Sequence, residues 1–145
     1  MIGREKEIGV LMEGLESNES QFIAVYGRRR IGKTMLVREA YAGRFTFLHT
    51  GLANVGMTEQ LAAFRDALCE YGLDGCGELH SWREAFVALK KLLSASRQGK
   101  KIVFIDEMPW MDTPRSGFVP PNCSRNTPMQ EQIPTEAYPS TASRR

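Results

Sequence analysis

The chain is poor in cysteine and histidine. Three cysteines and two histidines occur in 145 residues, and Cys69, Cys76 and Cys123 do not have the spacing of metal ligands. An odd number of cysteines without such spacing favours a reducing compartment over a disulfide framework. His49 and His80 are isolated in the sequence, so the simplest interpretation is that neither binds a metal.

The sequence also lacks a long hydrophobic run. No apolar stretch approaches the roughly 20 residues that a membrane-spanning helix needs. The first residues, Met1 to Glu5, do not resemble the apolar core of a secretory signal. These absences predict a cytoplasmic protein without a membrane segment.

Most of the chain has no excess of charge of one sign. The formal net charge is +2, but residues 113–145 contain four arginines and only two glutamates. Residues 1–112 therefore hold equal numbers of basic and acidic side chains. Because nucleic-acid binding depends strongly on a basic surface, the composition does not support a nucleic-acid partner.

Proline is rare until the end of the chain and is then frequent. Six of the seven prolines follow residue 113, where apolar residues are scattered without a helical or strand period. Such a segment buries too little apolar surface to offset the entropy lost on ordering. We therefore predict that residues 120–145 are a disordered, non-native tail and that residues 1–119 form part of a folded domain.

The strongest functional signal is the segment 27–34, which follows the pattern G-x-x-x-x-G-K-T of a phosphate-binding P-loop. The apolar run at 21–26 predicts a buried strand before the loop. The spacing of apolar residues predicts a helix over 33–41 after it. The alternative is an ordinary strand-to-helix turn that contains glycine and a chance lysine.

In a P-loop, backbone N–H groups and the helix N-terminus bind phosphate. Gly27 and Gly32 would permit the required backbone angles. Lys33 would reach the β- and γ-phosphates, and Thr34 would bind Mg²⁺ through its hydroxyl. We predict ATP and Mg²⁺ as cofactors, with nucleotide contacts from Gly27, Arg28, Arg29, Arg30, Ile31, Gly32, Lys33, Thr34 and Met35.

Further elements are predicted on both sides of this segment. Apolar spacing predicts helices over residues 4–16 and 58–71, and β-branched and aromatic residues predict a strand at 44–49. The sequence Ser-Trp-Arg-Glu at 81–84 is typical of a capping box at the start of another helix. The continuous apolar run at 102–105 predicts a buried strand.

The strand at 102–105 leads directly into Asp106 and Glu107. A carboxylate at the end of such a strand can hold Mg²⁺, usually through water molecules. A neighbouring glutamate can accept a proton from the attacking water. We predict that Asp106 contributes to the metal site with Thr34 and that Glu107 is the catalytic base. The alternative is an acidic turn without a catalytic role.

Three segments in this order resemble known ATPases. Residues 2–8, Ile-Gly-Arg-Glu-Lys-Glu-Ile, are similar to the F-x-G-R-x-x-E-L box that opens many AAA-type and STAND-related ATPases. The P-loop and the segment Ile-Asp-Glu-Met-Pro-Trp-Met at 105–111 resemble a prokaryotic family of AAA ATPases, sometimes called archaeal-type. The likeness covers residues 1–119.

This resemblance implies an α/β fold, in which helices flank the parallel sheet of a P-loop NTPase with the strand order 5-1-4-3-2. It also implies that Gly3 and Arg4 contact the nucleotide base. For Arg4, a solvated charge in the first turn of a helix is an equal alternative. A protein partner or a homo-oligomer is implied for the full-length family.

The chain departs from the family after Asp106 and Glu107. Strand 4 of the family should follow them, but residues 133–139 contain two prolines, which argues against a central strand. We therefore expect an incomplete core that lacks strands 4 and 5, truncated near residue 119.

The predicted function is ATP binding by an AAA-type ATPase core, with hydrolysis impaired in this chain. A small-molecule P-loop kinase is an alternative, which the Asp-Glu pair and the lack of an arginine-rich lid disfavour. A non-functional remnant of a truncated gene is another.

Overall fold

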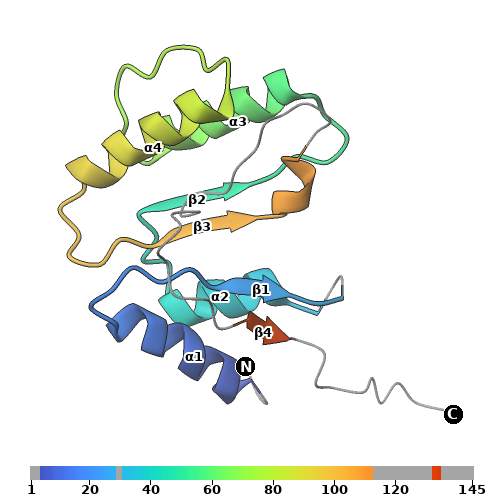
Figure 1. Ribbon diagram of the computed structural model, residues 1–145, viewed down its shortest axis with the longest axis vertical. Coiled ribbons are helices and arrows are strands. Elements are labelled where there is room, and N and C mark those ends of the chain that lie inside the picture. Colours follow the sequence, from blue (N-terminus) through green and yellow to red (C-terminus); the bar gives the residue numbers. More distant parts are fainter. Residues whose placement is uncertain (1–3, 29–30, 113–131, 135–145) are drawn as a thin grey trace, which may run out of the picture. The chain divides into compact units, whose positions relative to one another are not determined.

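The computed structural model describes residues 4–28, 31–112 and 132–134, which fall into two units (Figure 1). The first unit is drawn from residues 1–43 and 124–145, and the second from residues 44–123. Within the described residues, each unit contains a parallel sheet of two strands.

The first unit consists of two helices and two short strands. Helix α1 spans Glu5–Glu16, strand β1 spans Ala24–Tyr26, helix α2 spans Lys33–Tyr41 and strand β4 spans Gln132–Pro134. Strands β1 and β4 run parallel in continuous register over these three residues (Figure 1). The predicted helices at 4–16 and 33–41 are confirmed to within one residue.

Helices α1 and α2 pack against each other through apolar side chains. The buried residues are Leu11 on α1 and Leu36, Val37, Ala40 and Tyr41 on α2. The Tyr41 hydroxyl donates a hydrogen bond of 3.2 Å to the Leu11 carbonyl. Burial raises the pKa of Tyr41 above its usual value, so the phenol keeps the proton that it donates.

The strand predicted at 21–26 is shorter and less buried than the sequence predicts. The expected strand at 21–26 is reduced to β1, in which Ala24 and Val25 are half-buried and Tyr26 is 44% exposed. The prediction of a buried strand at 21–26 is therefore wrong. Apolar character alone does not determine burial, because burial also requires neighbouring elements on both faces of the strand.

Residues 132–134 form strand β4, although the sequence analysis assigned them to a disordered tail and excluded a central strand there. Pro134 is the last residue of the strand, and its missing N–H therefore costs at most one hydrogen bond at the strand end. Proline is tolerated at such positions and on edge strands. The other residues of the predicted tail at 120–145 lie outside the described residues.

The second unit contains two strands, two long helices and a short 3₁₀ helix. Its elements are β2 (Phe47–Thr50), α3 (Met57–Glu70), α4 (Trp82–Ala95), β3 (Val103–Asp106) and η1 (Met108–Trp110). Strand β2 pairs in parallel with β3, so that Phe47 is opposite Val103 and Thr50 is opposite Asp106. The predicted strand at 44–49 begins three residues too early.

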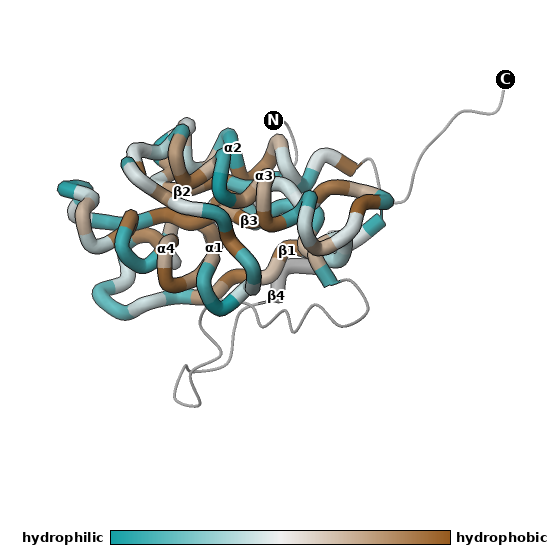
Figure 2. Tube along the Cα trace, turned by 90° about the horizontal axis from the view of Figure 1, so that it is seen from above, coloured by the Kyte–Doolittle hydropathy of each residue, from teal (hydrophilic) through white to brown (hydrophobic). Residues whose placement is uncertain are grey.

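An aromatic cluster forms the centre of the second unit. Phe47 of β2, Phe64 of α3 and Trp82 of α4 are fully buried, and the rings of Phe64 and Trp82 meet edge to face at a centroid distance of 5.6 Å. Helices α3 and α4 lie side by side, and the tube along α4 alternates between hydrophobic and hydrophilic colours (Figure 2). This alternation reflects a helix with one apolar face.

The two strand pairings agree with neighbours in the order that the family resemblance implies. In the order 5-1-4-3-2, strand 1 lies between strands 5 and 4, and strand 3 lies next to strand 2, so β4 occupies a place beside β1 that we expected to be empty. The observed pairs are β1 with β4 and β3 with β2. Two pairs of strands do not establish a five-stranded sheet, and the P-loop NTPase fold therefore remains a prediction.

Candidate functional site

The segment between β1 and α2 has the backbone conformation of a tight, glycine-dependent loop. Gly27, directly after β1, has a φ of 144°, and Gly32, directly before α2, has a φ of 78°. A Cβ atom built on Gly32 would meet no atom of the described residues within 4 Å. Glycine is therefore favoured at this position by its backbone angles, and the adjacent space is open to a ligand.

Lys33 folds back over this loop. Its Nζ atom donates hydrogen bonds of 3.1 Å to the Gly27 carbonyl and 2.9 Å to the Arg28 carbonyl. The ammonium group therefore links the first residue of α2 to the end of β1. A lysine held in this way places a positive charge beside the loop, and its three donors suit phosphate oxygens.

The first turn of α2 provides further donors. Its first helical hydrogen bond joins the Leu36 N–H to the Gly32 carbonyl at 2.9 Å. Helix geometry offers no acceptor to the backbone N–H groups that precede Leu36, and the helix dipole makes this end partly positive. Thr34 in this turn is half-buried, whereas Met35 is 61% exposed. The partial positive charge at this end of α2 therefore favours an anion.

Arg4 contacts the same loop from the start of α1. Its Nη2 atom donates a hydrogen bond to the Ile31 carbonyl. Its Nη1 atom is buried, with no hydrogen-bond partner in the part of the chain that the structure describes. Arg4 is therefore not the solvated first-turn charge that the sequence left open. The predicted contact of Arg4 with a nucleotide base stays a prediction. Three other predicted site residues, Gly3, Arg29 and Arg30, lie outside the described residues.

The acidic pair belongs to the second unit, so the structure does not place it relative to the loop. Asp106 is the last residue of β3, and its Oδ1 atom accepts a hydrogen bond of 2.9 Å from the Glu107 N–H. Glu107 has a φ of 50° and is the residue from which η1 begins. This left-handed conformation turns the chain sharply directly after the strand.

Gly51 and Gln60 support the backbone near the acidic pair, and neither was predicted to have a role. A Cβ atom on Gly51 would lie 2.5 Å from the Glu107 carbonyl oxygen, so only glycine fits without a shift. The fully buried Gln60 amide donates to the carbonyls of Leu52 and Trp110, each at 2.7 Å. Gln60 could have been recognised, because it shares the i, i+4, i+8 spacing of the apolar face with Phe64 and Leu68.

His49 is a second buried polar residue near the end of β2. It is 4% exposed, and its Nε2 atom has no hydrogen-bond partner among the residues described. Its ring packs against Phe64 at a centroid distance of 5.0 Å. Burial lowers the pKa of His49 to about 4. The neutral imidazole is therefore part of the aromatic cluster.

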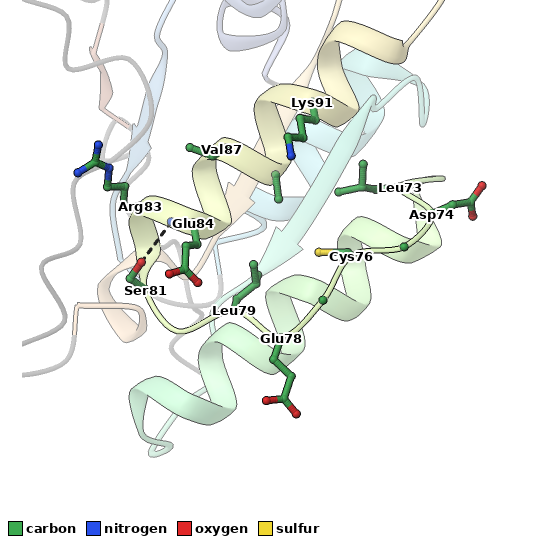
Figure 3. A pocket seen from close by; sticks show the side chains of 13 residues that line it. Leu73, Asp74, Cys76, Glu78, Leu79, Ser81, Arg83, Glu84, Val87 and Lys91 are labelled. Atoms are coloured by element: carbon green, nitrogen blue, oxygen red, sulfur yellow. Dashed lines mark hydrogen bonds between the residues drawn. The ribbon is translucent and has the colours of Figure 1, made fainter.

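The second unit also contains a groove of about 500 Å³ between residues 73–79 and α4 (Figure 3). The groove is lined by apolar residues and by charges of both signs, and Arg83 and Asp74 extend away from it in Figure 3. None of the predicted site residues lines it. Among the described residues, no group of three or more metal-ligating side chains is found. No helix in the same ranges is long and apolar enough to cross a membrane.

Comparison with known proteins finds a distant relative. The chain is 32% identical over 110 residues to the uncharacterized protein MJECL04 of Methanocaldococcus jannaschii. The match covers 74% of this chain but 22% of the relative, so the chain spans about a fifth of that protein's length. No profile of a protein family matches the chain, and no solved structure matches it either.

Proposed function

We propose that the chain binds Mg-ATP through residues 27–34 and forms part of an ATPase core. The observation that carries this proposal is the position of Lys33, whose ammonium group is hydrogen-bonded to the Gly27 and Arg28 carbonyls. These bonds keep a cation at the mouth of a loop that is framed by two glycines with positive φ. A bound triphosphate would replace these neutral carbonyl acceptors with charged phosphate oxygens, to which the ammonium group bonds more strongly.

The proposal assigns separate roles to the groups around the loop. Backbone N–H groups of the loop and of the first turn of α2 hold the phosphates, and Lys33 bridges the β- and γ-phosphates. Thr34 provides an oxygen ligand to Mg²⁺. Half-burial holds the Thr34 side chain in place, while the open space beside Gly32 leaves room for the phosphates.

For hydrolysis, the proposal places Asp106 at the metal and Glu107 at the attacking water. The water oxygen forms a bond to the γ-phosphorus, and the bond from that phosphorus to the β–γ bridging oxygen breaks. The proton lost by the water passes to the Glu107 carboxylate. The products are ADP and inorganic phosphate. This step needs Asp106 and Glu107, whereas binding of the phosphates needs the residues of the loop.

The test of binding compares two substitutions that remove the same charge from α2. Lys33→Ala removes the cation over the loop, whereas Arg38→Ala removes an exposed cation from the last turn of the helix. A charge-assisted hydrogen bond contributes about 1.5–3 kcal/mol, so Lys33→Ala should weaken the binding of a fluorescent ATP analogue by about 10- to 100-fold. Arg38→Ala should change the Kd less than about twofold, because an exposed charge on the last turn is screened by solvent. Equal affinity of Lys33→Ala and the unaltered chain would refute the assignment.

A further inference from the structure

Arg4 joins two parts of the first unit that are distant in sequence. It precedes the first residue of α1, and its guanidinium group donates to the carbonyl of Ile31 inside the P-loop. The packing of α1 on α2 holds the arginine in place, and the bond from Tyr41 to the Leu11 carbonyl is a second polar link between these helices. The loop is thus attached to the start of α1, which is neither the strand before the loop nor the helix after it.

The position of this hydrogen bond determines how one peptide unit of the loop is oriented. Because a trans peptide is planar, the Ile31 carbonyl and the Gly32 N–H point in opposite directions. With the carbonyl directed to Arg4, the Gly32 N–H points away from Arg4. A rotation of this peptide would reverse both groups and present a carbonyl dipole, instead of a donor, to a bound phosphate.

Glycine makes such a rotation unusually easy. Turning a peptide plane changes ψ of the first residue and φ of the second, and Gly32 populates positive and negative φ about equally. Its φ of 78° is therefore one of two accessible states, and no side chain at residue 32 prevents the change. Something outside the peptide has to select the state that binds phosphate.

Stability alone does not explain an arginine at this position. Nη1 of Arg4 is buried without an acceptor among the described residues, and an unpaired buried donor opposes folding. An apolar residue that packed between α1 and α2 would avoid this penalty. The bond to Ile31 is what an apolar residue could not supply.

We propose that Arg4 is a positioning residue of the P-loop: it holds the Ile31 carbonyl so that the Gly32 N–H faces the bound phosphates. This inference rests on the proposed phosphate-binding function of the loop. It assigns to Arg4 a contact with the loop backbone and none with the nucleotide base. Arg4 therefore acts on any ligand with a polyphosphate chain, whether or not the ligand contains a base.

The first experiment measures the Kd of Mg-ATP and of Mg-tripolyphosphate, which has no base, for three variants. Arg4→Met should weaken both ligands by a similar factor of about tenfold, because both lose the same backbone donor. Arg4→Lys should recover part of both affinities, since an ammonium group can still donate to the Ile31 carbonyl. Tyr41→Phe removes the hydrogen bond to the Leu11 carbonyl, which lies away from the loop, and it should leave both Kd values unchanged.

The second experiment needs no ligand. Relaxation dispersion of the backbone ¹⁵N nuclei, measured by NMR, should show more conformational exchange at Gly32 and Lys33 in Arg4→Met than in the unaltered chain, because the released peptide can rotate, while residues 37–41 of α2 stay the same. Tyr41→Phe should not produce this local difference. Unchanged exchange at Gly32 would overturn the positioning role even if the chain bound neither ligand.

The outcomes separate this inference from the proposed function. A loss of ATP affinity without a loss of tripolyphosphate affinity would assign Arg4 to the base and overturn the inference. An affinity loss shared by Arg4→Met and Tyr41→Phe, with equal falls in melting temperature, would also overturn it. If the unaltered chain binds neither ligand, the proposed function fails, and the NMR relaxation dispersion at Gly32 alone then decides whether Arg4 orients the peptide.

Discussion

At the scale of single residues, His49 shows how burial changes the pKa of a titratable group. Its imidazole packs beside Phe47 and Phe64, and burial lowers its pKa from 6.5 to about 4. The folded state therefore binds this proton less readily than the unfolded chain does. The stability that results is fully present above pH 6.5 and is lost as the pH falls from 6.5 toward 4.

This titration predicts a pH-dependent difference between His49→Phe and the unaltered chain. Each pH unit below 6.5 should cost the unaltered chain about 1.4 kcal/mol, so moving from pH 7.5 to pH 5.0 should cost about 2 kcal/mol more than in His49→Phe. Phenylalanine fits the aromatic surroundings and does not take up a proton. Urea denaturation followed by tryptophan fluorescence is suitable, because Trp82 and Trp110 belong to the same unit as His49.

The exposed His80 provides the control for this measurement. His80→Gln should keep the full pH dependence of the unaltered chain, because its side chain is not part of the aromatic cluster. Equal pH dependence of His49→Phe and the unaltered chain would show that His49 does not cause the loss of stability.

At the scale of elements, the start of α4 is an interaction that the sequence predicted and the structure contains. The Ser81 hydroxyl accepts a hydrogen bond of 3.3 Å from the Glu84 N–H, as the capping box requires. The reciprocal bond differs, because the Glu84 carboxylate accepts from the His80 N–H at 2.8 Å and not from Ser81. The pattern therefore identified the helix start but missed one partner by a residue.

We expect Ser81→Ala to destabilise the second unit by about 1 kcal/mol, the usual contribution of an N-cap serine. The matched control is Ser94→Ala in the last turn of the same helix, where the hydroxyl donates back to the Lys90 carbonyl at 2.9 Å. Alanine at position 94 should be neutral or slightly stabilising, because such a bond competes with the helix. Both variants are compared by the urea midpoint of tryptophan fluorescence, and equal midpoints would contradict the assigned cap.

The elements differ in how well the sequence predicts them. Helices α1 and α2 follow from apolar residues at helical spacing, because the period of 3.6 residues repeats along their whole length. Strands are three or four residues long, and a shift of a few residues moves an entire strand, as β2 shows. Strand β4 was missed because strand formation depends on a partner that lies far away in sequence.

At the scale of the whole molecule, the candidate site divides into a part that the sequence predicts and a part that it does not. The loop residues from Gly27 to Thr34 are contiguous, and their chemistry follows from the motif. The hydrogen bond from Arg4 to Ile31 spans 27 positions, and the hydrogen bond from Gln60 to Trp110 spans 50. Contacts at such separations depend on how elements pack, which local spacing does not determine.

The proposed function predicts that nucleotide binding depends on Mg²⁺ and that Asp106 contributes to this dependence. The affinity for ATP in the presence and absence of the metal tests this role of Asp106. ATP should bind more tightly in the presence of Mg²⁺ than in the presence of a chelator. Asp106→Asn should reduce the ratio of these two affinities.

Asp106→Asn suits this test because the amide oxygen of asparagine can still accept the Glu107 N–H. The lost negative charge should reduce the Mg²⁺-dependent gain in ATP affinity by about tenfold, as for other groups that orient metal-bound water. The Kd in the presence of a chelator should stay the same, since no metal is then bound. Asp74→Asn removes an exposed carboxylate from the same unit and should leave both values unchanged. If Asp106→Asn preserves the Mg²⁺ dependence while Thr34→Val abolishes it, the metal is held by the first unit alone and Asp106 has no part in the site.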